Sequence, residues 1–217
     1  MCNASLILAS ASPRRRALLS LLGLPFHVVE ADVEEAQLEG ERPQGMVMRL
    51  SRAKAEAVAA GSQERGIVIA CDTIVALDEE VLGKPADPGE ATNMLRRLRG
   101  REHRVFSGLT VLDMESAQLH TACDETEVHM RFYSDEEIAA YVASGDPLDK
   151  AGAYAIQSAS FRPVARLEGC YASVIGLPLG RVAQALRAFG LAVPSDAAIA
   201  RSCAAFTGHP CCLARAK

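Results

Sequence analysis

Short apolar runs alternate with longer segments of mixed polarity through the first sixty residues. An apolar run bounded by polar or glycine residues is typical of a buried strand, whereas apolar positions recurring every three or four residues indicate a helix. Proline in a first helical turn and glycine after the last turn mark the helix ends. The pattern predicts strands over 5–9 and 26–29 and helices over 13–22 and 43–61, with Ser12 as the N-cap of the first helix.

The next apolar run is interrupted by a carboxylate. Residues 67–71 are apolar, Asp72 and Thr73 break the run, and it resumes over 74–77. A nearly continuous apolar run indicates a strand that is buried on both faces. The pattern therefore predicts a buried strand that is broken at Asp72-Thr73, and an acid at such a position needs an explanation.

The second half of the chain continues this alternation. We expect a turn over 80–85, and a hairpin where two β-branched runs flank a polar connection. Ser134 followed by three acidic residues is a strong helix start, because the acids complement the helix dipole. The pattern predicts helices over 88–98, 135–143 and 178–189, strands over 105–112, 123–132, 163–167 and 172–175, and an irregular segment over 146–157.

The order of these elements predicts a mixed α/β fold. No internal repeat or low-complexity tract divides the chain before Pro194, so we expect one domain over 1–194. The remaining segment, 195–217, has weak periodicity. We expect it to be a loosely packed tail and assign it no function.

Composition excludes several classes of function. The 217 residues are 49% hydrophobic and 23% charged, with a formal net charge of −4. No overall field attracts a polyanion, so sequence-independent nucleic-acid binding is not expected. We find no apolar stretch that could cross a bilayer and no secretion signal. The seven cysteines, from Cys2 to Cys212, lack paired CxxC spacing. These features predict a cytoplasmic protein with free thiols and no membrane partner.

Four residues around the first predicted helix could bind phosphate. Ser10 and Ser12 precede the helix, and Arg14 and Arg15 lie in its first turn. Free backbone N–H groups, hydroxyl donors and guanidinium groups at a helix N-terminus suit a phosphate oxygen. The alternative is a capped surface helix with solvated arginines. The segment is not a Walker loop, because the glycines are missing.

Carboxylates supply the second set of candidates. A strand-end acid such as Asp72 can hold a metal or activate a water molecule, although it could instead form an Asx-type turn. The acidic run with Asp32, Glu34 and Glu35 could ligate Mg²⁺, or it could simply be solvated. Lys54, Lys84 and Gln157 are weak candidates when taken singly. Zinc-hydrolase and serine-hydrolase motifs are not present in the sequence.

Taken together, these positions resemble the Maf family of nucleoside triphosphate pyrophosphatases. The resemblance extends from Leu6 to about Leu191 and depends on several blocks in the same order. The blocks are LASASPRR over 8–15, DVEE over 32–35, AKA over 53–55, DTIV over 72–75, GKP over 83–85, DKAGAYAIQ over 149–157 and VIGLPL over 174–179.

The resemblance implies an elongated, two-lobed α/β fold like that of the inosine triphosphatase group, with a nucleotide cleft between the lobes. It implies hydrolysis of a nucleoside triphosphate to the monophosphate and pyrophosphate with Mg²⁺ or Mn²⁺, and a homodimer. Asp72 matches the proposed general base, and Glu35 is our best further metal ligand. Substrate binding would fall to the remaining candidates: Ser10, Ser12, Arg14, Arg15, Lys54, Thr73, Lys84 and Gln157.

The resemblance also favours dTTP and UTP, because Arg15, Thr73 and Gln157 match members that act on these nucleotides. The chain departs from the family pattern at Cys71, where alanine is usual, and at Ala155, where glycine is typical. Two alternatives remain open. One is a nucleotide-binding regulator of septum formation, and the other is a pyrophosphatase for modified nucleotides.

Overall fold

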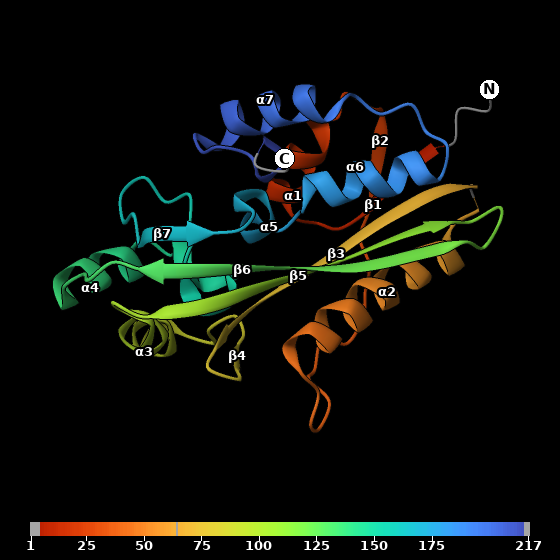
Figure 1. The fold of residues 1–217 in the computed structure, drawn as a ribbon. Helices are drawn as coiled ribbons and strands as arrows, with labels where there is room; N and C mark the ends of the chain where they lie inside the picture. The colour runs from red at the N-terminus through yellow and green to blue at the C-terminus, as the bar shows by residue number, and fades with distance from the viewer. Residues whose placement is uncertain (1–4, 64, 215–217) are drawn as a thin grey trace.

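The computed structural model describes residues 5–63 and 65–214. Cys2 therefore lies outside the described residues. Seven strands form one mixed sheet in the order β2-β1-β3-β5-β6-β7, and β4 pairs with β3 (Figure 1). The strands are β1 (Ser5–Ala9), β2 (Phe26–Val29), β3 (Gly66–Leu77), β4 (Glu80–Leu82), β5 (Glu102–Asp113), β6 (Leu119–Met130) and β7 (Val164–Glu168).

Helices cover both faces of the sheet. In Figure 1, α1, α5, α6 and α7 gather above the long strands and α2 lies below them. The α-helices are α1 (Pro13–Ser20), α2 (Pro43–Gly61), α3 (Pro88–Leu98), α4 (Asp135–Ala143), α5 (Tyr171–Ile175), α6 (Leu179–Ala188) and α7 (Asp196–Thr207), and the 3₁₀ helices are η1 (Asp146–Asp149), η2 (Ala151–Ala153) and η3 (Cys212–Ala214). None of the helices among the described residues is both long and apolar enough to cross a membrane.

Local sequence signals account for the helix starts. The Ser12 side chain accepts a hydrogen bond from the backbone N–H of Arg15, and proline follows it at the first helical position. Ser134 and Glu137 form a capping box at the start of α4. Each cap satisfies backbone N–H groups that a helix start leaves without a partner. The predicted starts of α1 and α4 are confirmed.

The strand that contains Asp72 is continuous, so the predicted break is wrong. β3 runs through Asp72 and Thr73 for twelve residues and pairs with β5 along most of its length, including Asp72 with Gly108. Its outer edge explains the polar residues. There β1 pairs as far as Ile69 and β4 pairs from Val75 onward. Between these points the edge has no strand partner among the described residues, which leaves a gap in the sheet beside Asp72 and Thr73.

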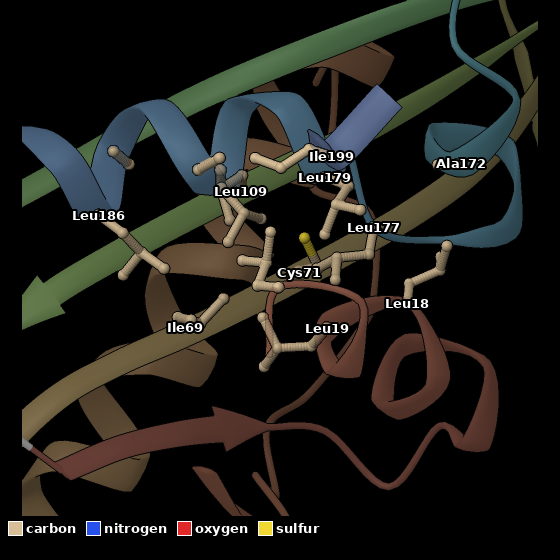
Figure 2. Close-up of a cluster of buried hydrophobic side chains, with 14 of the residues drawn as sticks. Leu18, Leu19, Ile69, Cys71, Leu109, Ala172, Leu177, Leu179, Leu186 and Ile199 are labelled. Atoms are coloured by element: carbon tan, nitrogen blue, oxygen red, sulfur yellow. The ribbon is translucent and has the colours of Figure 1, made fainter. Parts of the chain in front are cut away.

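Two apolar cores share one face of the long strands. One core contains Ile69 and Leu109 and packs under α1, α5, α6 and α7, as Figure 2 shows for Ile69, Leu109, Leu186 and Ile199. The other contains Val75 and packs against α3 and α4. Thr73 separates the two along β3. A polar region between two cores is consistent with the expected two-lobed form.

The opposite face of the sheet is covered by α2. Val47 and Leu50 of α2 pack against Ile74 and other side chains of β3 and β5. The approach is close at Gly108, where an added Cβ would lie 2.1 Å from the carbonyl oxygen of Val47. Glycine is therefore required in the middle of β5.

Three further predictions need correction. Residues 172–175 belong to the helix α5, because burial against the α1 and α6 side of the sheet overrides the β-propensity of Val174 and Ile175. Residues 80–82 form the strand β4 within the expected turn. The segment 195–214 is not loosely packed, because α7 buries Ile199 and Cys203 in the first core.

Candidate active site

A cavity of about 420 Å³ opens where β1 ends beside the unpaired edge of β3. It lies between the two apolar cores. Residues from β1, α1, α2, β3 and the 149–157 segment line it. All ten of the predicted site residues are among the lining residues: Ser10, Ser12, Arg14, Arg15, Glu35, Lys54, Asp72, Thr73, Lys84 and Gln157.

The ammonium group of Lys54 joins two carboxylates on the α2 side of the cavity. Its Nζ lies 2.6 Å from Oδ1 of Asp72 and 2.5 Å from Oε1 of Glu35. The side chains of Lys54 and Asp72 are both more than nine-tenths buried, whereas that of Glu35 is about half exposed, at 49%. Burial opposes ionisation of Glu35, but the hydrogen bond and charge of Lys54 outweigh it and lower the pKa of that carboxyl.

Arg15 connects three walls of the cavity. Its Nε donates to the carbonyl oxygen of Gly176 at 2.9 Å, Nη1 donates to Oγ of Ser10 at 3.3 Å, and Nη2 donates to Oγ1 of Thr73 at 3.4 Å. The backbone comes close at Gly176, which has a φ of +126°. A Cβ there would lie 3.2 Å from Nε of Arg15. The guanidinium plane is therefore fixed before any ligand binds.

Thr73 is held on its other side by a chain of hydroxyl groups. Its Oγ1 lies 2.9 Å from Oγ of Ser107, which donates to the carbonyl oxygen of Ser173 in α5 at 2.8 Å. Ser107 and Ser173 are both fully buried. This chain links β3, β5 and α5 at the boundary between the two cores. Thr73 thus has a fixed position in the cavity wall.

A second charged network surrounds the mouth of the cavity. Arg14 Nη1 lies 3.5 Å from Oδ2 of Asp149, and Lys150 Nζ lies 2.5 Å from Oδ1 of the same carboxylate. Burial opposes ionisation of Asp149, but Lys150 and Arg14 lower its pKa overall. Asp149 and Lys150 also line the cavity, although they are not among the ten residues that the sequence predicts for the site. Their presence in the block DKAGAYAIQ, which is one of those that carry the family resemblance, was the available signal.

Tyr154 is a further lining residue that the sequence analysis missed. Its hydroxyl group lies 2.7 Å from Nε2 of His103, and the two rings meet edge to face. Burial lowers the pKa of His103 to about 4, so the imidazole is neutral at pH 7. A neutral histidine behind the wall adds no charge to the cavity. No spacing or motif in the sequence connects these two residues.

The weaker candidates lie at the periphery of the cavity. Lys84 and Gln157 line it with exposed side chains. Of the acidic run, Glu35 belongs to the lining, whereas Asp32 and Glu34 do not. The backbone of the Lys84 turn is anchored, because the carbonyl oxygen of Gly83 accepts a hydrogen bond from Gly152 N at 3.0 Å.

The donor set around Lys54 suits a divalent cation. Two carboxylates that share one ammonium group form a site for positive charge, and Mg²⁺ commonly takes one or two carboxylates plus phosphate oxygens. Within 5–63 and 65–214, the three-residue group with ligand atoms closest together is a different one, Glu102, Glu127 and His129. It lies outside the cavity lining.

The chain is similar in sequence to several known proteins. A curated dTTP/UTP pyrophosphatase from Geotalea uraniireducens (strain Rf4) is 49% identical over 188 residues, which cover 87% of this chain and 96% of that protein. Another, from Pelotomaculum thermopropionicum, is 47% identical over 185 residues, covering 85% and 96%.

A solved nucleoside-triphosphatase / dITP/XTP pyrophosphatase from Mycobacterium abscessus has 14% identity and a TM-score of 0.43, covering 85% of this chain and 95% of that one. The family model described as Maf-like protein matches residues 5–189. The chain therefore belongs to the Maf family.

Proposed function

We propose that this protein hydrolyses nucleoside triphosphates to the monophosphate and pyrophosphate, with dTTP and UTP favoured. The observation that carries the proposal is the cavity itself, where Arg15 and Lys54 flank the buried carboxylate of Asp72. Positive groups can offset the charge of the phosphates while a carboxylate accepts a proton from water. The names of the two bacterial relatives support both the reaction and the substrate.

In the proposed reaction, the phosphates bind near the start of α1. Arg14 and Arg15, the hydroxyl groups of Ser10 and Ser12, and Lys84 supply donors. Asp72 takes a proton from a water molecule as the water oxygen bonds to the α-phosphorus. The bond from that phosphorus to the α–β bridging oxygen breaks, and pyrophosphate leaves with the electron pair. One nucleotide and one water thus give one monophosphate and one pyrophosphate.

A divalent cation, Mg²⁺ or Mn²⁺, would bind at Glu35 and Asp72. When bound, it would polarise phosphoryl oxygens and neutralise developing charge. Lys54 holds the two carboxylates together, since its Nζ contacts both of them. Lys54 would thereby orient the carboxylate of Asp72 toward the water.

The nucleobase of the substrate would occupy the part of the cavity near Thr73 and Gln157. A site that hydrogen-bonds a pyrimidine edge rejects bases with the wrong donors, because buried polar groups are left unpaired. Apolar walls from Val75, Val105 and Ile156 surround this region. The first assay should therefore compare nucleotides that differ in their base.

We further propose that the protein acts in the cytoplasm as a homodimer that binds no nucleic acid. The formal net charge of −4 supports the absence of nucleic-acid binding. Light scattering coupled to size-exclusion chromatography tests the dimer, and a monomeric mass at micromolar concentration would contradict it.

The decisive experiment is pyrophosphate release from dTTP, UTP, CTP, GTP, 7-methyl-GTP and ITP with Mg²⁺ or Mn²⁺. We expect selective turnover of dTTP and UTP, and a roughly 10²–10⁴-fold lower kcat in Asp72→Asn. Asp78→Asn is the matched control, because Asp78 is exposed and paired with Arg101 on a turn. Nucleotide binding without turnover in the native protein would instead favour a nucleotide-binding regulator, and preference for ITP would favour a modified-nucleotide enzyme.

A further inference from the structure

Four cysteines gather where the C-terminal segment packs on the rest of the protein. Cys170 precedes α5, Cys203 lies in α7, Cys211 precedes η3, and Cys212 is the first residue of η3. Cys170, Cys203 and Cys211 are buried in the first core, whereas Cys212 is partly exposed. Three of the four lie beyond residue 189, where the match to the family model ends.

The C-terminal segment is in close contact with α5 and α6. The ring of His209 stacks on that of Tyr171 with centroids 4.2 Å apart. Leu213 lies so close to α6 that a Cβ at Gly180 would come within 2.8 Å of its Cδ2. These contacts hold Cys212 beside Cys170, the residue that precedes Tyr171.

The thiols neighbour one another in successive pairs and do not surround one common centre. The side chain of Cys203 interacts with that of Cys211, Cys211 with Cys212, and Cys212 with Cys170. Any three thiols of this set are too dispersed to meet within 4.8 Å, since the residues described by the structure contain one group at that spacing and it is Glu102, Glu127 and His129. Pairwise chemistry therefore fits this arrangement better than a tetrahedral metal site.

The two thiols of the last pair differ in character. The interaction between the two side chains lowers the pKa of Cys212 and raises that of Cys170. A thiolate is the nucleophilic form of cysteine, and partial exposure gives an oxidant access to it. Cys212 can react first, and the buried Cys170 lies next to it to complete the bond.

We propose that Cys170 and Cys212 form a reversible disulfide that fastens the C-terminal segment to α5. With hydrogen peroxide as oxidant, the Cys212 thiolate attacks one peroxide oxygen and becomes a sulfenic acid, and the other oxygen leaves as water after protonation. The Cys170 sulfur then attacks the sulfenic sulfur and loses its proton, and the second oxygen leaves as water. Two thiols and one peroxide give one disulfide and two waters.

The position of this pair connects it to the cavity. α5 begins just after Cys170 and is followed by Gly176, whose carbonyl oxygen accepts a hydrogen bond from Arg15, and the carbonyl oxygen of Ser173 accepts one from Ser107. A disulfide at the start of this five-residue helix fixes the element whose other end supports the cavity wall.

The test uses the full chain, oxidised with hydrogen peroxide, alkylated and digested with trypsin. We expect the peptide 167–181 to be linked to 202–215, with fragment spectra assigning the bond to Cys170 and Cys212, and dithiothreitol to reverse it. Oxidation should raise Tm by several degrees, because the crosslink closes a loop of about forty residues. In Cys212→Ser both effects disappear, and Cys170→Ala provides a second variant.

Cys123→Ser is the matched control, because Cys123 is also partly exposed but contacts the carbonyl oxygen of Asp124 instead of another thiol. It should retain the crosslink and the rise in Tm. Retention of all thiols after oxidation, a bond between Cys203 and Cys211 or between Cys211 and Cys212, or release of one zinc ion per chain on thiol modification would each overturn the proposal.

Discussion

Replacing Lys54 with methionine tests how the buried charges of the cavity are balanced. Methionine fills a similar volume but carries no charge, so the two carboxylates lose the ammonium group that they share. Asp72 has a side chain only 8% exposed and would be left as a buried charge without its cation. Glu35 is about half exposed and can recover water. Most of the cost should therefore come from Asp72.

The magnitude follows from the burial of the pair. Removing one partner of a buried ion pair costs about 3–5 kcal/mol, because the other charge remains desolvated. Since 1 kcal/mol shifts Tm by roughly 2–4 °C in a chain of this size, Lys54→Met should lower Tm by about 6–20 °C. Adding Asp72→Asn to the Lys54→Met variant removes the unpaired charge and should recover most of the lost Tm.

Urea unfolding followed by circular dichroism at pH 7.5 measures the free energy of unfolding for the single and double variants. Arg52→Met is the matched control on the same helix, because Arg52 is exposed and pairs with Glu56 one turn away. Such a pair contributes about 0.3–0.5 kcal/mol. If Lys54→Met costs no more than Arg52→Met, or if Asp72→Asn fails to restore stability, the reasoning about the buried charge is refuted.

Three further predictions concern the catalytic rate and the free energy of unfolding. Arg15→Lys should lower kcat/KM at least tenfold, because a lysine cannot reach the three oxygens that the guanidinium group contacts, whereas the exposed neighbour change Arg16→Lys should not; equal losses would contradict this. Because the pKa of Glu35 is lower in the folded protein than its ordinary value of 4.5, the ionised carboxylate should stabilise the fold at pH values above 4.5. This stabilisation should be lost as the pH falls through the folded pKa, so the difference in unfolding free energy between the native protein and Glu35→Gln should shrink in acid. A difference that stays constant down to pH 3 would argue against this. Gly108→Ala should destabilise by about 1–3 kcal/mol because its Cβ would meet a carbonyl oxygen of α2, while Gly61→Ala, in open space, should have little effect; similar unfolding midpoints would disprove the close approach.

Local sequence signals predicted most elements because their causes are local. Ser12 with the following proline, and Ser134 with Glu137, satisfy backbone groups within one helical turn. By contrast, residues 172–175 carry a strand-like run but form a helix, since the surrounding core determines their conformation. The C-terminal segment also appeared irregular by periodicity, although α7 contributes Ile199 to that core.

The candidate site was predicted as a set of residue types in ordered blocks, and the cavity contains all ten. What the sequence could not show was their contacts. Lys54 and Asp72 are 18 residues apart, and Arg15 reaches Gly176 across 161 residues. Tyr154 and His103 belong to different parts of the chain and carry no common pattern.

The sequence by itself determined the helix caps and most of the apolar strands, because these depend on neighbouring residues, and it predicted phosphate binding from side-chain chemistry alone. The tertiary structure decided why Asp72 can lie within a strand. β1 ends before it and β4 begins after it, so one edge of β3 is left open to the cavity. Strand pairing joins segments far apart in the chain, and the lengths of neighbouring strands are fixed only when the sheet forms.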